Sequence, residues 1–275
     1  MAPRIDIITL GVDELEKARE FYERGFGGHV SAEDGALNVT LGPNASCLAL
    51  RRWDAVASEA GVHAHTTGFR AFTLSYILES AEDVDQVLNR LECHGGRVSK
   101  PPRNAGWGYS AYVTDPSGYL WKIASSKRRP LLGHKETATN NGHAVNPQEV
   151  PITIGVADMK RTKHFYEEGL GLPVKKAFGS KFVMFSGDAG TSDLGVYKRE
   201  ALAKDAAVQP EGDGFHGFSI THSVDTRQRV DELLARVAHA GAEIVRAPVA
   251  ADNGGYAASF ADPDGNLWQL ATRDS

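Results

Sequence analysis

The sequence is poor in cysteine and in long apolar runs, and each shortage excludes a class of protein. Two cysteines in 275 residues, Cys47 and Cys93, are too few for a disulfide scaffold and lack the spacing of a zinc finger. No apolar stretch approaches the roughly 20 residues that span a bilayer. Residues 1–4 lead into a strand-like segment without the apolar core of a signal peptide. We therefore expect a cytoplasmic protein without a membrane partner.

Positive charge is also in short supply, because 30 Lys and Arg face 35 Asp and Glu, giving a net charge of −5 at pH 7. A surface that binds phosphates needs clustered positive charge. The longest basic run, residues 127–129, is followed by Pro130 and has no aromatic side chains within it. We therefore expect no nucleic-acid partner.

What the sequence does contain is an internal duplication. Several blocks recur in the same order at a nearly constant offset, which indicates two copies of one domain. The matching pairs are GVDELEKAREFYERGFG (11–27) with GVADMKRTKHFYEEGLG (155–171), VDQVLNRLECHGG (84–96) with VDELLARVAHAGA (230–242), and YVTDPSGYLWKIA (112–124) with SFADPDGNLWQLA (259–271). We predict domains at 1–127 and 149–275, joined by a polar linker at 128–148.

Each copy in turn contains two similar halves. Alternating apolar residues in 8–12 predict a strand, and an amphipathic helix with Phe21 and Tyr22 follows it. Short, turn-bounded strands come next. The second half repeats this order, with an i, i+3, i+4, i+7 stripe over residues 84–91 and a glycine stop at 95–96. The fold class is therefore predicted as α+β, built from four βαβββ modules.

These features together resemble the vicinal oxygen chelate superfamily, which includes glyoxalases, bleomycin-resistance proteins and extradiol dioxygenases. The resemblance rests on the paired modules, the Phe-Tyr of the first helix, and the closing DPxGxLWxxA phrase at 115–124 and 262–271. It implies two tandem domains whose curled mixed sheets surround a pocket that holds a divalent metal. Single-domain relatives complete such pockets by dimerising, so two fused copies are compatible with either a monomer or a homodimer.

The metal-ligand positions that the resemblance implies carry unsuitable side chains in this sequence. They fall on Ile7 and Pro151 in the first strands and on Lys122 and Gln269 in the last strands. Metal sites need imidazole, thiolate or carboxylate groups, and an ammonium group offers only protons. We therefore predict no cofactor and no metal. His216 is a single candidate ligand, with a hydrogen-bonded or surface histidine as its alternative.

The predicted pocket lining combines inward-facing strand residues with aromatic and basic residues near strand ends. In an apolar pocket Lys122 would have a lowered pKa and could act as a base or Schiff-base amine; the alternative is an ion pair or a solvent-exposed ammonium group. Tyr109 and Tyr197 are further acid–base candidates. The full set is Ile7, Thr9, Arg51, Thr73, Ser75, Trp107, Tyr109, Lys122, Thr153, Tyr197, Ser219, Thr221, Tyr256 and Gln269.

Three functions follow from this pattern. The first is a metal-independent protein that binds a small, partly aromatic molecule, as in sequestration or resistance. The second is a metal-free isomerase, lyase or cyclase. The third is a metal-dependent glyoxalase or dioxygenase whose ligand positions are misaligned above. The missing ligands favour the first function, and whether the protein is an enzyme stays open because a fold does not supply a reaction.

Overall fold

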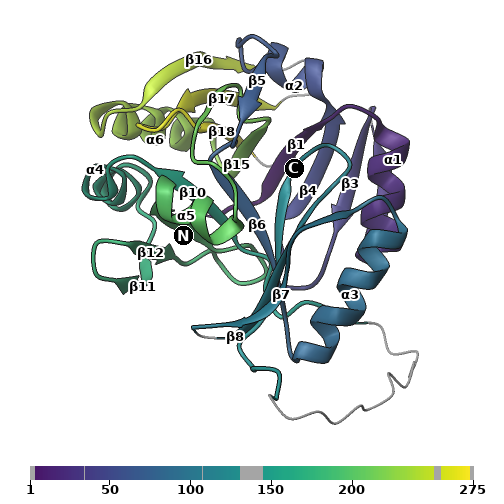
Figure 1. Cartoon of the computed structure of the whole chain (residues 1–275). Helices are drawn as coiled ribbons and strands as arrows, with labels where there is room; N and C mark the ends of the chain where they lie inside the picture. The colour runs from purple at the N-terminus through teal and green to yellow at the C-terminus, as the bar shows by residue number, and fades with distance from the viewer. Residues whose placement is uncertain (1–3, 34, 107, 131–144, 251–254, 273–275) are drawn as a thin grey trace.

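The computed structural model describes residues 4–33, 35–106, 108–130, 145–250 and 255–272 (Figure 1). Its elements form four βαβββ modules in chain order, so the predicted α+β class is confirmed. Most of the predicted linker, residues 131–144, lies outside the described part of the chain. Within the described part, no helix is long and apolar enough to cross a membrane.

The modules have closely matched elements. The first comprises β1 (Ile7–Val12), α1 (Leu15–Glu20), the π-helix η1 (Phe21–Gly25), β2 (His29–Glu33), β3 (Ala36–Thr40) and β4 (Cys47–Arg52). The second comprises β6 (Phe72–Leu78), α3 (Ala81–Cys93), β7 (Arg97–Ala105), β8 (Gly108–Thr114) and β9 (Leu120–Ser125). The third comprises β10 (Ile152–Val156), α4 (Met159–His164), the π-helix η2 (Phe165–Leu170), β11 (Val174–Phe178), β12 (Phe182–Phe185) and β13 (Leu194–Lys198). The fourth comprises β15 (Phe218–Val224), α6 (Arg227–His239), β16 (Glu243–Ala250), β17 (Tyr256–Ala261) and β18 (Leu267–Thr272).

Two short helices and a small ribbon complete the structure. They are α2 (Trp53–Glu59) after β4, α5 (Arg199–Ala206) after β13, and the antiparallel pair β5 (Thr66–Gly68) and β14 (Gly212–Gly214).

The two large sheets do not follow the two halves of the sequence. Sheet A has the strand order β16-β17-β18-β15-β1-β4-β3-β2, so it joins the fourth module to the first. Sheet C has the order β11-β12-β13-β10-β6-β9-β8-β7, so it joins the third module to the second. The joins are the antiparallel pairs β1–β15 and β10–β6. Each eight-stranded sheet is therefore completed within one chain by strands from both copies.

Strand alternation gives each sheet one helix-packed face and one opposite face. Ile8, Leu10 and Val12 of β1 are fully buried in the core, as their spacing predicts. Figure 1 shows α1 and α3 along one side of the molecule and α4 and α6 along the opposite side. We call the face without these four helices the cup face; it carries Thr9 and Gln269 in sheet A and Thr153 and Lys122 in sheet C.

The repeated Asp-Pro turn ties each last strand to the first helix of its half. The Asp115 carboxylate accepts hydrogen bonds from the backbone N–H groups of Ser117 and Tyr119 and from the Tyr22 hydroxyl, the last at 2.8 Å. Asp262 accepts the equivalent bond from Tyr166. Burial raises the pKa of both aspartates to about 6, although the hydrogen bonds that they accept oppose the shift. The Phe-Tyr pair of the first helix is therefore part of the same packing unit as the turn.

Candidate functional site

In sheet A, the positions at which the family resemblance implies metal ligands lie in one row across three strands. Ile7 of β1 is paired with Thr221 of β15, and Thr221 is paired with Gln269 of β18. The Thr221 hydroxyl donates a hydrogen bond to Gln269 Oε1 at 3.2 Å. Residues that are more than 200 positions apart in the sequence therefore share one place on the cup face.

Sheet C contains the equivalent row. The Ser75 N–H donates to the carbonyl oxygen of Pro151 at 2.9 Å, and Ser75 is paired with Lys122 of β9. The two rows thus hold an aliphatic group, a hydroxyl and an amide in sheet A, and a proline, a hydroxyl and an ammonium group in sheet C.

These donor sets do not fit the divalent metal that the family resemblance implies. Within the described residues, no group of three or more His, Cys, Asp and Glu side chains is placed to hold a metal ion. His216 lies just before β15, where its Nδ1 is 3.1 Å from Asn266 Oδ1 and its ring stacks on Phe218. Burial lowers the pKa of His216. The one histidine that the sequence offered as a ligand is thus in a hydrogen bond away from both rows.

Lys122 is in an ion pair. Its Nζ lies 2.5 Å from Oδ2 of Asp205, near the end of α5, and its side chain is only 16% exposed. The Tyr112 hydroxyl donates to the same oxygen at 2.7 Å, and Lys100 Nζ lies 3.4 Å from Oδ1. Burial would raise the pKa of Asp205, but the two lysines and Tyr112 outweigh it and lower that pKa. Asp205 is thus ionised at neutral pH, and the ion-pair alternative for Lys122 is the one observed.

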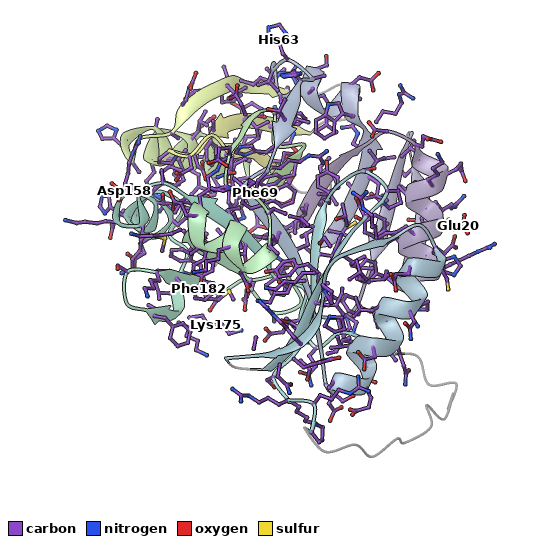
Figure 2. All side chains as sticks on the ribbon, in the orientation of Figure 1. Glu20, His63, Phe69, Asp158, Lys175 and Phe182 are labelled. Carbon is purple, nitrogen blue, oxygen red and sulfur yellow. The ribbon has the colours of Figure 1, made fainter. Side chains whose placement is uncertain are left out.

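The remainder of the cup face of sheet C is covered. The central residues Thr73, Ser75 and Thr153 are all buried. A methyl group added at Gly195 would lie 2.7 Å from Thr153 Oγ1 and 3.2 Å from Cε2 of Phe182, so the Phe182 ring lies against this part of the sheet (Figure 2). Helix α5 covers a further part through its buried residues Leu202 and Ala203.

The cup face of sheet A is more accessible. Thr9, Ser219 and Ser259 are half-buried and Gln269 is exposed. In the equivalent strand β3, the residues that correspond to Phe182 and Met184 at the offset of 146 are Ala36 and Asn38. No aromatic ring therefore comes from this strand.

The short helix of sheet A is also held differently. Glu59 of α2 corresponds to Asp205 at the offset of 146, but it pairs with Arg51 of β4 at 2.5 Å rather than with the last strand. Gln269 therefore has no carboxylate from α2 beside it.

Two of the predicted pocket residues lie on the helix-packed faces instead. The Tyr109 hydroxyl donates to Asp85 of α3, and the Tyr256 hydroxyl donates to Asp231 of α6, both at 2.9 Å. Tyr109 is paired across β8 and β9 with Ser125, in phase with the buried pair Val113 and Trp121. Strand parity thus excludes both tyrosines from the cup faces, which corrects the prediction. Trp107 lies outside the described residues.

Sequence reasoning missed three residues that the structure brings to Lys122: Lys100, Tyr112 and Asp205. A signal for each was present. Tyr112 shares the strand parity of Ser110, opposite to that of Tyr109, and Lys100 is its partner on β7. The alignment of α2 with α5 places an acidic residue at the same point of both short helices.

The structure also contains a cavity of about 250 Å³ beside the start of β9. Its lining includes Phe69, Arg70, Leu120 and Val208. The Arg70 guanidinium lies between the rings of Trp53 and Tyr119, at 4.7 and 4.6 Å from their centroids. Arg70 therefore supports the packing of this region through cation–π contacts.

Comparison with known proteins places these features in a family. The model of the Glyoxalase/Bleomycin resistance protein/Dioxygenase superfamily matches residues 4–123 and 149–270. The chain therefore belongs to this superfamily. No curated protein matches the sequence.

Solved structures show the same fold. Glyoxalase I from Zea mays is 16% identical, with a TM-score of 0.66 over 98% of this chain and 92% of the other. A putative dioxygenase from Bacillus subtilis is 15% identical, with a TM-score of 0.62 over 99% of this chain and 86% of the other. At such identities the likeness concerns the architecture, so function has to be argued from the cup faces.

Proposed function

We propose that the protein binds a small, uncharged, partly apolar molecule on the cup face of sheet A without a metal ion. The observation that carries this proposal is the set of side chains there. Thr9, Ser219, Ser259 and Gln269 offer neutral hydroxyl and amide groups, and all four are accessible to some extent. Ile7 adds an aliphatic surface beside them. Such a mixture of apolar area and a few hydrogen-bonding groups is typical of small-molecule sites.

Binding without chemical turnover is the form of this function that the residues favour. Lys122 is held by Asp205, and Tyr109 lies on the helix-packed face of sheet C. On the cup face of sheet A, burial raises the pKa of the Cys47 thiol, which keeps it protonated at neutral pH. A general base needs a pKa near the working pH, and burial raises the pKa of both the Tyr109 hydroxyl and the Cys47 thiol away from it. Binding alone is sufficient for sequestration or resistance.

The experiment is ligand-observed NMR with three uncharged aromatic probes: phenol, indole and benzamide. We expect at least one to bind the wild type and to lose binding in Ser219→Trp, which fills the centre of the cup face. Gln228→Trp is the matched control, because residue 228 is exposed on α6, on the opposite side of sheet A. Equal binding to both variants, or no binding to any of them, would refute the proposal.

The absence of a metal requirement is tested separately. Elemental analysis of the purified protein measures its metal content. Probe binding is then measured before and after dialysis against EDTA, and we expect the same affinity in both cases. A stoichiometric divalent ion whose removal abolishes binding would favour a metal-dependent glyoxalase or dioxygenase instead.

A further inference from the structure

Three hydrogen-bond donors lie side by side on the cup face of sheet C. Lys100 of β7 is paired with Tyr112 of β8, and Tyr112 is paired with Lys122 of β9. Both ammonium groups also lie near the Tyr112 ring, at 5.4 and 5.6 Å from its centroid. We call Lys100, Tyr112 and Lys122 the donor row. Two ammonium groups and a hydroxyl that converge in this way form a binding site for a carboxylate.

In this structure the carboxylate comes from the protein itself. Asp205 Oδ2 accepts from both Lys122 and Tyr112, while Lys100 Nζ donates to the main-chain carbonyl oxygen of Asp205 and lies 3.4 Å from Oδ1. Asp205 stands in the last turn of α5, where the helix dipole disfavours negative charge. Its position is therefore stabilised by the donor row rather than by the helix.

Fastening the short helix does not by itself require this arrangement. In sheet A the equivalent acidic residue, Glu59, fastens α2 to Arg51 on the adjacent β4. Asp205 instead reaches past its own β13 to the last strands of the second module. The residues of sheet A that correspond to the donor row, Arg246, Ser259 and Gln269, contain only one cation.

Apolar side chains occupy the same face on the other side of the central strands. Tyr197 of β13 makes an edge contact with Phe182 of β12 at 5.8 Å, and the half-buried Met184 follows on the same strand face. Burial and the charge of Asp205 raise the pKa of Tyr197. A molecule with a carboxylate at one end and a flat apolar body would match both sides.

We propose that the cup face of sheet C is a binding site for a small aromatic or aliphatic carboxylate, and that Asp205 occupies the carboxylate position in the free protein. Asp205 is then an internal competitor. A carboxylate ligand binds only those molecules in which Asp205 has left the site, so its apparent affinity is lower than its intrinsic affinity. Replacing the Asp205 carboxylate should therefore strengthen binding. This site is separate from the one proposed on sheet A and takes a ligand of different charge.

The experiment compares benzoate with the neutral benzamide by isothermal titration calorimetry at pH 7 and constant ionic strength. We expect benzoate to bind Asp205→Asn about tenfold or more tightly than it binds the wild type. Adding Lys122→Met to Asp205→Asn should abolish the gain, because the donor row is then incomplete. Glu59→Gln is the matched control in the other short helix and should leave benzoate affinity unchanged.

A second measurement keeps the proposal testable if Asp205→Asn does not fold. In the wild type, excess benzoate should shift the NMR amide signals of Tyr112, Lys122 and Ala206, and benzamide should not. Benzoate that binds both proteins equally, or that leaves these signals unmoved, would overturn the proposal. Ser219→Trp should not alter benzoate binding, so failure of the sheet A proposal would be distinguishable.

Discussion

The two cup faces are built from equivalent strands, yet the cup face of sheet C is covered more completely than that of sheet A. Sheet C has Phe182, Lys122 and Asp205 where sheet A has Ala36, Gln269 and Glu59. The backbone pairings are the same, because β6–β9 and β15–β18 are both parallel and both lie next to the central antiparallel join.

This difference shows that the two copies share the backbone scaffold but carry different side chains on their cup faces. The helix-packed faces retain matching anchors, such as the buried Trp121 and Trp268. The cup faces diverged in charge and volume. Where the two copies agree we infer a demand of folding, and where they differ we infer a demand of function.

The largest expected effect tests a point at which the two copies agree. Below about pH 3 Asp262 is protonated in both folded and unfolded chains. Between pH 4 and 6 the folded state holds more protons, since burial raises the pKa of Asp262 from 3.8 to about 6. The free energy of unfolding of the wild type should therefore fall by about 3 kcal/mol relative to Asp262→Asn as the pH rises from about 3 to about 7. Urea unfolding at several pH values measures this difference.

Asp115→Asn is the matched variant of the first copy and should give the same slope, because the pKa of Asp115 is raised to about 6 by the same burial. If the wild type and both variants kept parallel pH profiles, the pKa values of Asp115 and Asp262 would not be raised by folding.

The second prediction concerns the pair Lys122 and Gln269. Lys122→Met removes one partner of a mostly buried ion pair and should lower the free energy of unfolding by about 2 kcal/mol, less than for a fully buried pair because the Asp205 side chain is 31% exposed. Gln269→Met at the exposed equivalent position should change it by less than about 0.5 kcal/mol. Chemical denaturation of both variants gives the comparison. Equal effects would mean that the two cup faces are energetically alike.

The third prediction concerns the equivalent positions of β3 and β12, which carry Ala36 and Phe182. Phe182→Ala should destabilise the protein by about 1 to 2 kcal/mol, since the ring is only half-buried and covers Gly195. The reverse change, Ala36→Phe, should leave stability within about 0.5 kcal/mol and weaken binding of neutral probes to sheet A. Thermal melts and ligand-observed NMR report the two effects. Unchanged probe binding in Ala36→Phe would place the neutral site elsewhere.

The sequence was sufficient for the module order because local patterns determine it. The apolar stripe of α3 and the alternation of β1 each depend on neighbours a few residues apart, and Val84 and Ile8 are buried as those patterns predict. The closing Asp-Pro turn was likewise predicted from its residues.

The contents of the cup faces could not be predicted in the same way. Asp205 reaches Lys122 across 83 positions, and neither residue has a local pattern that names its partner. Tyr109 and Tyr256 were misplaced because each lies near the start of its strand, where one residue of phase decides the face. Contacts of this kind follow from the way strands of the two sequence halves pair within each sheet, and the repeat alone does not specify that pairing.

The smallest expected effect compares the two short helices directly. A double-mutant cycle on Arg51 and Glu59, with Arg51→Met and Glu59→Gln, should give a coupling energy of about 0.5 kcal/mol, because side chains exposed by 33% and 52% are well hydrated. Raising the salt concentration to about 0.5 M should weaken this coupling, since the Debye length then falls to about 4 Å. The same cycle on Lys122 and Asp205, with Lys122→Met and Asp205→Asn, should give a larger coupling that persists in salt, because those side chains are more buried. If both couplings were equally small and equally screened, Asp205 would be an ordinary surface partner of Lys122, and the covered state of sheet C would depend on Phe182 and Leu202 alone.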